Sequence, residues 1–388
     1  MQSLAQSWLV LSLTSSALLL GLVSVFQFLP ILLIGMLTGV VADRVPKRNL
    51  LIVTQSLSGV SAATLAVLTF GGHIQLWHIY TMALLLGIVN AFDMPARQSF
   101  VAEMVGREDL TNAIALNSSL FNAARIVGPA IAGGLLAAVG PAWCFAINAS
   151  SYIAVIAGLL MMRVQPGVRA VAGRGLEQAR EGLAYVRSHP ELRRPIMLVG
   201  LVATFGMNFN VWIPLLAKQD LNGGASGFGL LMAASGVGSL LGALGLAFFI
   251  RSVQRWMLYI TAGALGIFNL LLALAGGFQL ALPVAMGVLA FVGLSSTTTM
   301  SMANTTVQTS SPDLMRGRIM AVYMTVFAGT APFGALFSGA IASRWGAPVS
   351  IGVGGVIVMV AVLLLGRDVL RPGVNAPVQR LLPRAGRS

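Results

Sequence analysis

Charged residues are scarce in this sequence of 388 residues. Asp, Glu, Lys and Arg together make up 9% of the chain and hydrophobic residues make up 57%, whereas a soluble domain is about 25% charged. So few charges leave too little polar surface to cover a globular protein. The composition therefore excludes an ordinary soluble domain and predicts a chain that lies mostly in lipid.

Cysteine, histidine and acidic residues are also few. The one cysteine, Cys144, lies inside an apolar run, and the chain has 3 His and 11 acidic residues. These numbers exclude a disulfide framework and a metal-ligand cluster. The sequence also has no phosphate-binding loop and no pairing of a nucleophile with a base. We therefore expect no catalytic site, no metal, no cofactor and no enzymatic activity, and the lack of a nucleotide site argues against ATP-driven pumping by this chain alone.

Continuous apolar runs of about 20 residues fill most of the chain. Backbone groups in lipid must pair within a helix or a closed barrel, and these runs do not alternate polar with apolar residues, so they predict helices. The predicted fold class is an all-α membrane protein with about twelve spans. The spans are expected at roughly 1–14, 17–41, 50–71, 75–94, 111–138, 141–163, 195–217, 226–250, 255–276, 279–303, 318–341 and 346–366.

The first predicted span, 1–14, is too short to cross a bilayer, which needs about 20 helical residues. We interpret it as truncated within the span by a misassigned start; a functional short form is the alternative. The interpretation bears on mechanism because no Asp or Glu lies at mid-depth in any predicted span. A missing half-helix could carry the carboxylate that proton-coupled carriers commonly use.

The net charge of +13 comes from basic residues in alternate short loops and in the tail. Loops rich in Lys and Arg face the cytoplasm, which predicts a multi-pass protein of the cell inner (plasma) membrane with a cytoplasmic C-terminus. The charges form no stripe interleaved with aromatics, so nucleic acid is not an expected partner. The loops on the basic side hold Arg44, Lys47, Arg48, Arg97, Arg107, the arginines of 164–194, Arg251, Arg255, Arg316 and Arg318, whereas the alternate loops hold only Lys218 and Arg344.

One break in composition divides the chain into two halves. We predict an N-terminal six-helix bundle at 1–163, a cytoplasmic linker with an amphipathic helix at 164–194, a C-terminal six-helix bundle at 195–366 and a basic cytoplasmic tail at 367–388. A plain linker fits the middle stretch equally well. The halves also resemble each other, since PARQSFVAEMVGRED after the fourth span matches NTTVQTSSPDLMRGR after the tenth. Repeated halves indicate a transporter with its substrate site between them near the midplane.

The turn between the second and third spans, GVVADRVPKRNL at 39–50, resembles motif A of the major facilitator superfamily. The matching residues are Gly39, Asp43, Arg44, Lys47 and Arg48. Pro46 departs from the family pattern, which usually has glycine there. Asp43 could pair with the N-terminus of a neighbouring helix, and the basic residues could bridge to an acid on the fourth span, for which Asp93 is the candidate. The resemblance implies that this cluster latches the two halves in the outward-facing state; a basic turn that only sets topology is the alternative.

The fifth span, NSSLFNAARIVGPAIAGG at 117–134, loosely resembles motif C, a Gly-Pro pattern associated with antiporters. Gly128 and Pro129 predict a bend, because proline removes a helical hydrogen bond; ordinary helix packing is the alternative. Arg125 falls near the bilayer centre, where an arginine usually faces the bundle interior. It could hold an anionic substrate group or respond to proton movement, or it could pair with Asn122 as structural glue.

Other amides lie at mid-span and could line a central cavity. Together with Arg125 and Asn122, the predicted substrate or coupling residues are Gln27, Asn148, Asn208 and Asn210. Each alone can serve as a hydrogen-bonding contact between helices. With Phe26 and Phe205 nearby, the set suits an amphiphilic pocket.

The resemblance covers nearly the whole chain. PARQSFVAEMV, NAIALNSSLFNAARIVGPA and RGRIMAVY are similar to the branch of the superfamily that contains the enterobactin exporter and drug–proton antiporters. This implies two six-helix bundles and proton-driven efflux of a small amphiphilic compound, a drug or siderophore, by alternating access in a monomer surrounded by membrane lipid. An uptake or lipid-flipping carrier of the same fold is one alternative, and a non-transporting membrane scaffold or receptor is another.

Overall fold

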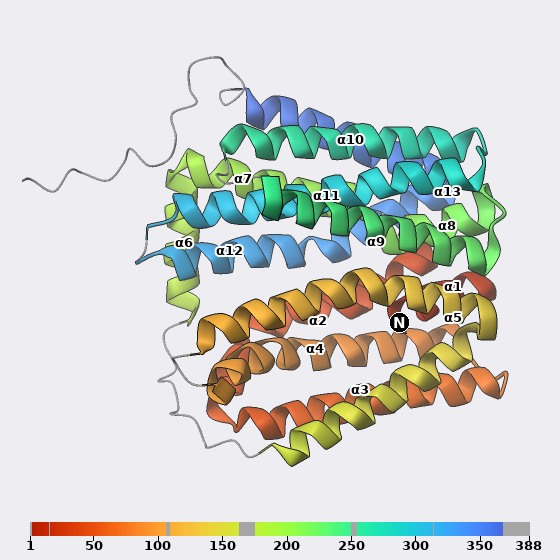
Figure 1. Cartoon of the computed structure of the whole chain (residues 1–388), viewed down its shortest axis with the longest axis horizontal. Coiled ribbons are helices and arrows are strands. Elements are labelled where there is room, and N and C mark those ends of the chain that lie inside the picture. Colours follow the sequence, from red (N-terminus) through yellow and green to blue (C-terminus); the bar gives the residue numbers. More distant parts are fainter. Residues whose placement is uncertain are drawn as a thin grey trace, which may run out of the picture.

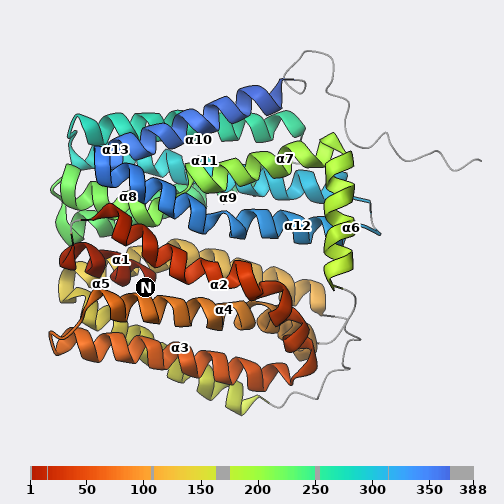
Figure 2. The same ribbon diagram turned by 180° about the vertical axis from the view of Figure 1, so that it is seen from behind.

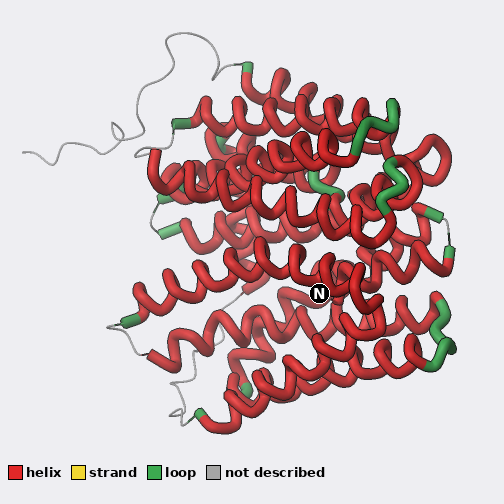
Figure 3. Tube along the Cα trace, turned by 45° about the vertical axis from the view of Figure 1, so that its right-hand side comes forward, coloured by secondary structure: helices red, strands yellow, loops and turns green. Residues whose placement is uncertain are grey.

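A computed structural model describes residues 2–14, 16–105, 109–162, 175–249, 254–312 and 314–367. Over these residues the chain is nearly all helix and contains no strand (Figure 3), which confirms the predicted all-α class. By length and composition, nine helical stretches of this described part could cross a membrane.

Figure 1 shows the helices coloured along the sequence. The first half contains α1 (Gln2–Leu13), α2 (Ala17–Arg44), α3 (Lys47–Phe70), α4 (Leu76–Val105) and α5 (Leu110–Met161). The second half contains α6 (Gly175–Ser188), α7 (Pro190–Leu201), η1 (Val202–Gly206), α8 (Phe209–Leu215), η2 (Leu216–Asp220), α9 (Gly224–Phe249), α10 (Arg255–Gly277), α11 (Leu282–Ser310), α12 (Arg316–Gly329) and α13 (Ala331–Gly366), where η1 and η2 are short π-helical segments.

Two of these helices each contain two membrane passes separated by a glycine. Gly140 in α5 has φ 81° and ψ 176°, and Gly346 in α13, 206 positions later, has φ 85° and ψ 165°. Such dihedral angles are open to glycine and to few other residues. With these two breaks, with the run from α7 to η2 counted as one interrupted pass, and with α12 and the part of α13 before Gly346 counted as another, the helices of the described residues give twelve passes besides α6, of which the first is the short α1.

The passes lie side by side in two groups, and α6 crosses their ends. Figures 1 and 2 show α2 to α5 on one side and α9 to α13 on the other, with α1 near the boundary. α6 packs against α12 and α7 and runs across the passes (Figure 2). We call the end that holds α6 and the α2–α3 turn the basic end, and the end that holds Gly140 and Gly346 the opposite end.

Close helix crossings recur in the two halves. A Cβ on Gly87 of α4 would lie 2.5 Å from the backbone oxygen of Gln27 in α2, and a Cβ on Gly293 of α11 would overlap the backbone oxygen of Ser235 in α9. Gly293 follows Gly87 by 206 positions, and Ser235 follows Gln27 by 208. Backbones come this close where a small residue permits it, so the repeat seen in the sequence extends to the packing of each half.

The two halves press together near the opposite end. A Cβ on Gly21 of α2 would lie 2.6 Å from the backbone oxygen of Ala335 in α13, and a Cβ on Gly133 of α5 would overlap the backbone of Gly229 in α9. Gly21 and Gly229 lie within the first two turns of their helices, and Gly133 lies two turns before Gly140. Buried apolar side chains from both halves form one continuous cluster.

Candidate functional site

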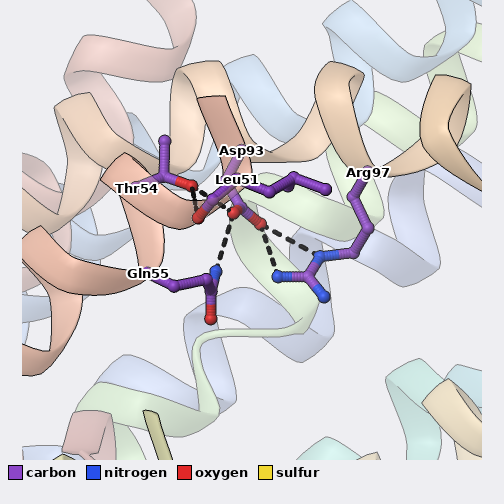
Figure 4. A network of polar contacts seen from close by, with 5 residues as sticks. All are labelled: Leu51, Thr54, Gln55, Asp93 and Arg97. Carbon is purple, nitrogen blue, oxygen red and sulfur yellow. Dashed lines mark hydrogen bonds and ion pairs between the residues drawn. The ribbon is translucent and has the colours of Figure 1, made fainter. Parts of the chain in front are cut away.

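A buried carboxylate in α4, that of Asp93, organises a polar network between α3 and α4 (Figure 4). Its Oδ1 accepts hydrogen bonds from Thr54 Oγ1 and Gln55 Nε2, each at 2.7 Å. Its Oδ2 accepts from Arg97 Nε at 3.0 Å and Nη2 at 2.9 Å. The side chain of Asp93 is 10% exposed, so these four bonds satisfy a charge that would be costly to bury unpaired.

Helical spacing explains how this network forms. Asp93 and Arg97 are four residues apart and share a face of α4, while Thr54 and Gln55 belong to the buried side of α3, which packs on α4. The Thr54 hydroxyl also lies 3.0 Å from the carbonyl of Leu51, which gives it a second acceptor. Arg97 is 48% exposed. The network therefore ties two helices of the first half together and reaches the surface only through Arg97.

Arg48, expected from motif A to bridge to Asp93, has other partners. Its Nε and Nη2 donate to the carbonyls of Leu159 and Leu160, each at 2.6 Å. These carbonyls lie in the last turn of α5, where a helix has no internal donors for them. Arg97, assigned from the sequence only to topology, is a basic partner of Asp93, and the bridge expected from Arg44 or Lys47 stays a prediction.

The other motif A residues belong to the end of α2 and the start of α3. Lys47 is buried at the first residue of α3. The backbone of α2 continues through Gly39, Asp43 and Arg44 to its end, and their side chains fall outside the described part of the structure.

Two of the predicted central amides bind α1. Asn148 Nδ2 donates to Gln2 Oε1 at 3.0 Å, and Gln27 Nε2 donates to Ser3 Oγ at 3.5 Å. The structure thus brings Gln27 and Asn148 to neighbouring residues of one helix. The polar residues of α1 were not among the predicted site residues, although Gln2 and Gln6 are spaced four apart and indicate a polar face.

The seventh pass is interrupted at the two asparagines that the sequence singled out. Asn208 lies between η1 and α8 with non-helical dihedrals, is buried, and donates from Nδ2 to the carbonyl of Thr204 at 2.6 Å. It therefore satisfies a carbonyl that the break leaves free. Asn210 is exposed on α8, and α8 contacts helices of both halves.

Arg125 and Asn122 lie on the first pass of α5, and their side chains and that of Pro129 fall outside the described part. Within α5, Gly140 has non-helical dihedral angles, and the helix runs on through Gly128. The predicted bend at Gly128 and Pro129 and the predicted role of Arg125 therefore stay predictions.

Aromatic pairs occur in both halves. Phe26 of α2 contacts Tyr80 of α4 with ring centroids 5.3 Å apart, and Phe205 of η1 meets Phe337 of α13 edge to face at 4.9 Å. All four side chains are partly exposed. Among the described residues, no group of three His, Cys, Asp or Glu side chains could hold a metal ion.

Comparison with known proteins gives one consistent result. Residues 1–381 match the MFS_3 family model, described as a transmembrane secretion effector. The chain is 29% identical over 351 residues to the multidrug efflux pump Tap of Mycolicibacterium fortuitum (87% of this chain, 84% of the relative). It is 27% identical over 345 residues to the staphyloferrin A transporter of Staphylococcus aureus (88% and 85%). Among solved structures, a D-xylose–proton symporter superposes with a TM-score of 0.75 at 14% identity, covering 97% of this chain and 94% of the symporter, which confirms the predicted major facilitator fold.

Proposed function

Since this chain belongs to the MFS_3 family of the major facilitator superfamily, we propose that it exports a small amphiphilic compound, such as a drug or a siderophore. Membership makes the chain a transporter of a small molecule and not an enzyme. Export is supported by the multidrug efflux pump and the siderophore transporter among its relatives. The observation that supports transport is the pair of repeated helix crossings. Crossings repeated in both halves indicate two similar bundles that can move as rigid bodies.

The basic end faces the cytoplasm in this proposal, and the chain lies in the inner membrane as a monomer surrounded by lipid. Arg48, Arg97 and the exposed arginines of α6 and α7 all lie at that end, and an excess of basic residues marks the cytoplasmic side. The C-terminus then lies in the cytoplasm. The described arrangement, with its halves packed together at the opposite end, is a state that takes substrate from the cytoplasm.

The substrate contacts α8 and the helices around it. Asn210 is an exposed amide on a pass that touches both halves, and an amide on a membrane pass is costly unless it faces protein, water or a polar ligand. Gln27 and Asn148 act in a supporting role, because their amides are bound to α1 in this state. Arg125 and Asn122 complete the site from α5. The aromatic pairs provide the apolar surface that an amphiphile needs.

The motif A cluster works at the basic end. Asp43 and Arg44 are in the last turn of α2, just before α3 in the chain. Asp93 in turn fixes α3 to α4 through its hydrogen bond with Gln55. In our proposal Asp43 and Arg44 latch the basic end shut when the opposite end opens, and the Asp93 network keeps the turn between α2 and α3 in position for this. Coupling to the proton gradient supplies the energy for the cycle.

Efflux tests this proposal. We would express the full chain in a bacterial strain that lacks its own efflux pumps and load the cells with a fluorescent amphiphilic dye. Cells with the chain should lose the dye faster than cells with empty vector, and a protonophore should abolish the difference. Unchanged retention across a wide panel of dyes and siderophores would refute export, and faster accumulation would indicate uptake, as in a symporter of this fold.

A pair of variants tests the substrate site in the same assay. Asn210→Ala should raise the KM for efflux several-fold, because it removes a polar group from the proposed contact surface. Asn222→Gly is the control, since Asn222 is an exposed asparagine in the turn between η2 and α9 and glycine tolerates its positive φ of 49°. Equal KM values for the two variants at equal membrane levels would remove Asn210 from the site.

A further inference from the structure

α1 is one of the elements of the first half that meet α8 and α9 near the opposite end. It packs against α5 of its own half and against α8 of the second half. The indole of Trp8 stacks on the ring of Phe228 in α9, with centroids 5.7 Å apart and planes at 14°. Val10 and Leu11 have no exposed surface. A movement that separates the two halves at this end must therefore free α1 from the second half.

A cation from the second half caps the end of α1. The last carbonyls of a helix lack internal donors, and in α1 the carbonyl of Leu9 is satisfied locally by Ser12 Oγ at 2.7 Å. The carbonyl of Leu11 instead accepts a hydrogen bond from Lys218 Nζ. Lys218 lies in η2, and a positive charge at a helix C-terminus also interacts favourably with the helix dipole. Lys218 and the Trp8–Phe228 stack together form what we call the α1 clamp.

One residue of α1 opposes this clamp. Gln6 has 0% exposed surface, and neither its Nε2 nor its Oε1 has a hydrogen-bond partner. A buried donor and a buried acceptor without partners destabilise the state that contains them. Because no accessible surface remains around Gln6, water does not relieve the penalty while α1 is packed. The penalty ends only when α1 moves and the amide finds water or another partner.

We propose that Lys218 and Gln6 are positioning residues that set, through α1, the balance between the closed and the open states of the opposite end. This inference rests on the proposed alternating access. Lys218 favours the closed state because it holds the end of α1. Gln6 favours the open state because its amide can be hydrated there. The two effects keep either state from being too stable to leave, which a cycling transporter requires.

Access of a reagent to α1 measures this balance without any substrate. Ser7 lies beside Gln6 and is 6% exposed, so Ser7→Cys reports exposure of α1 with little change in volume. The one natural cysteine, Cys144, is buried and is replaced by alanine in the reporter background. A membrane-impermeant maleimide added to intact cells then labels Cys at position 7 only when the opposite end opens.

We expect opposite shifts from the two residues. Lys218→Met should raise the labelling rate about three- to tenfold, and Lys218→Arg should stay near the parent because it keeps a cationic donor. Gln6→Met, which keeps the shape of glutamine without its amide, should lower the rate at least fivefold. Arg344→Gln is the control, because Arg344 is an exposed cation near the opposite end, two positions before Gly346.

Two outcomes overturn the inference, namely a shift of both variants in the same direction or no shift in either. If Lys218→Met or Gln6→Met does not reach the membrane, Lys218→Gln or Gln6→Leu takes its place with the same expectations. In the efflux assay Gln6→Met should lower both the maximal rate and the KM for cytoplasmic substrate, a paired change that simple loss of folded protein does not give. Labelling needs no substrate, so a failed efflux assay would leave its result intact and would count against the proposed function alone.

Discussion

The Asp93 network allows an ion pair and a hydrogen bond from a neutral donor to be compared on one buried carboxylate. Asp93→Leu removes all four hydrogen bonds and leaves an apolar side chain of similar size. We expect this change to lower the free energy of unfolding by about 2–4 kcal/mol, because it leaves a buried polar group without its partner. The question is which of the three partners contributes most.

The exposure of each partner decides the order. Gln55 is 6% exposed, so its amide becomes a buried, unpaired donor, a loss of about 1–3 kcal/mol. Thr54 still has the carbonyl of Leu51 within 3.0 Å. Arg97 is 48% exposed, and an ion pair so close to solvent contributes only about 0–1 kcal/mol. The neutral amide should therefore be coupled to Asp93 more strongly than the guanidinium.

Double-mutant cycles measure the two couplings. We would combine Asp93→Leu with Gln55→Leu in one cycle and with Arg97→Met in the other, and follow reversible unfolding in mixed micelles by circular dichroism. Side-chain hydrogen bonds in membrane proteins average about 0.6 kcal/mol and reach about 1.7. We therefore expect about 1–1.7 kcal/mol for the Gln55 cycle and about 0.5 or less for the Arg97 cycle. A larger coupling for Arg97 than for Gln55 would show that burial does not set the order and would refute the reasoning.

The remaining predictions concern helix ends and glycines. Arg48→Met should destabilise the protein by about 1–2 kcal/mol and speed hydrogen exchange at the last turn of α5, whereas unchanged exchange would show that its two carbonyl contacts contribute little. Gly140→Ala should cost about 1 kcal/mol or more because φ there is 81°, while Gly158→Ala, with open space around it, should be neutral or stabilising in the same unfolding assay. Gly133→Ala should cost about 1–3 kcal/mol by pushing α5 from α9 and should slow efflux, and Gly134→Ala, which meets nothing within 4 Å, should do neither; equal efflux from the two would argue against a tight crossing.

The membrane passes could be predicted from the sequence because lipid leaves the backbone few choices. A run of about 20 apolar residues must be helical in lipid, so composition alone indicated the passes. The turns at Gly140 and Gly346 are also visible as gaps in the pattern. The repeat of the two halves was visible in short motifs, and the glycine crossings extend it to positions such as Gly87 and Gly293 that no motif marked.

The hydrogen-bond partners of the charged side chains could not be predicted from the sequence in the same way. Arg48 and Arg97 are both basic and both close to Asp93 along the predicted topology, and only the packing of α3 against α5 directs Arg48 to the carbonyl of Leu159. Likewise, nothing in the sequence places Lys218 beside the carbonyl of Leu11, which is 207 positions away. Contacts between distant segments depend on how helices cross, and hydrophobic periodicity carries no information about that.

The two halves share their crossings but not their charges, and this bears on how the protein moves. The position 206 residues after Asp93 is Thr299, which is buried and donates to the carbonyl of Ser295 in its own helix at 2.7 Å. At the opposite end, the position 208 residues before Lys218 is Val10, which is also buried. The Asp93 network and the Lys218 contact therefore have no charged counterpart at these repeat-related positions.

A gate built from a charge in one half and a helix end in the other is weaker than a buried ion pair between halves. A helix end and a nearby charge contribute about 0.3–2 kcal/mol, whereas breaking a buried ion pair costs about 3–5 kcal/mol. The α1 clamp has this weaker form, with Lys218 against the carbonyl of Leu11, and the latch proposed for Asp43 has it too. Symmetric crossings such as those of Gly21 and Gly133 then supply the pivots. We expect the states open at either end to differ in free energy by only a few kcal/mol, a gap that a bound substrate or a proton can reverse.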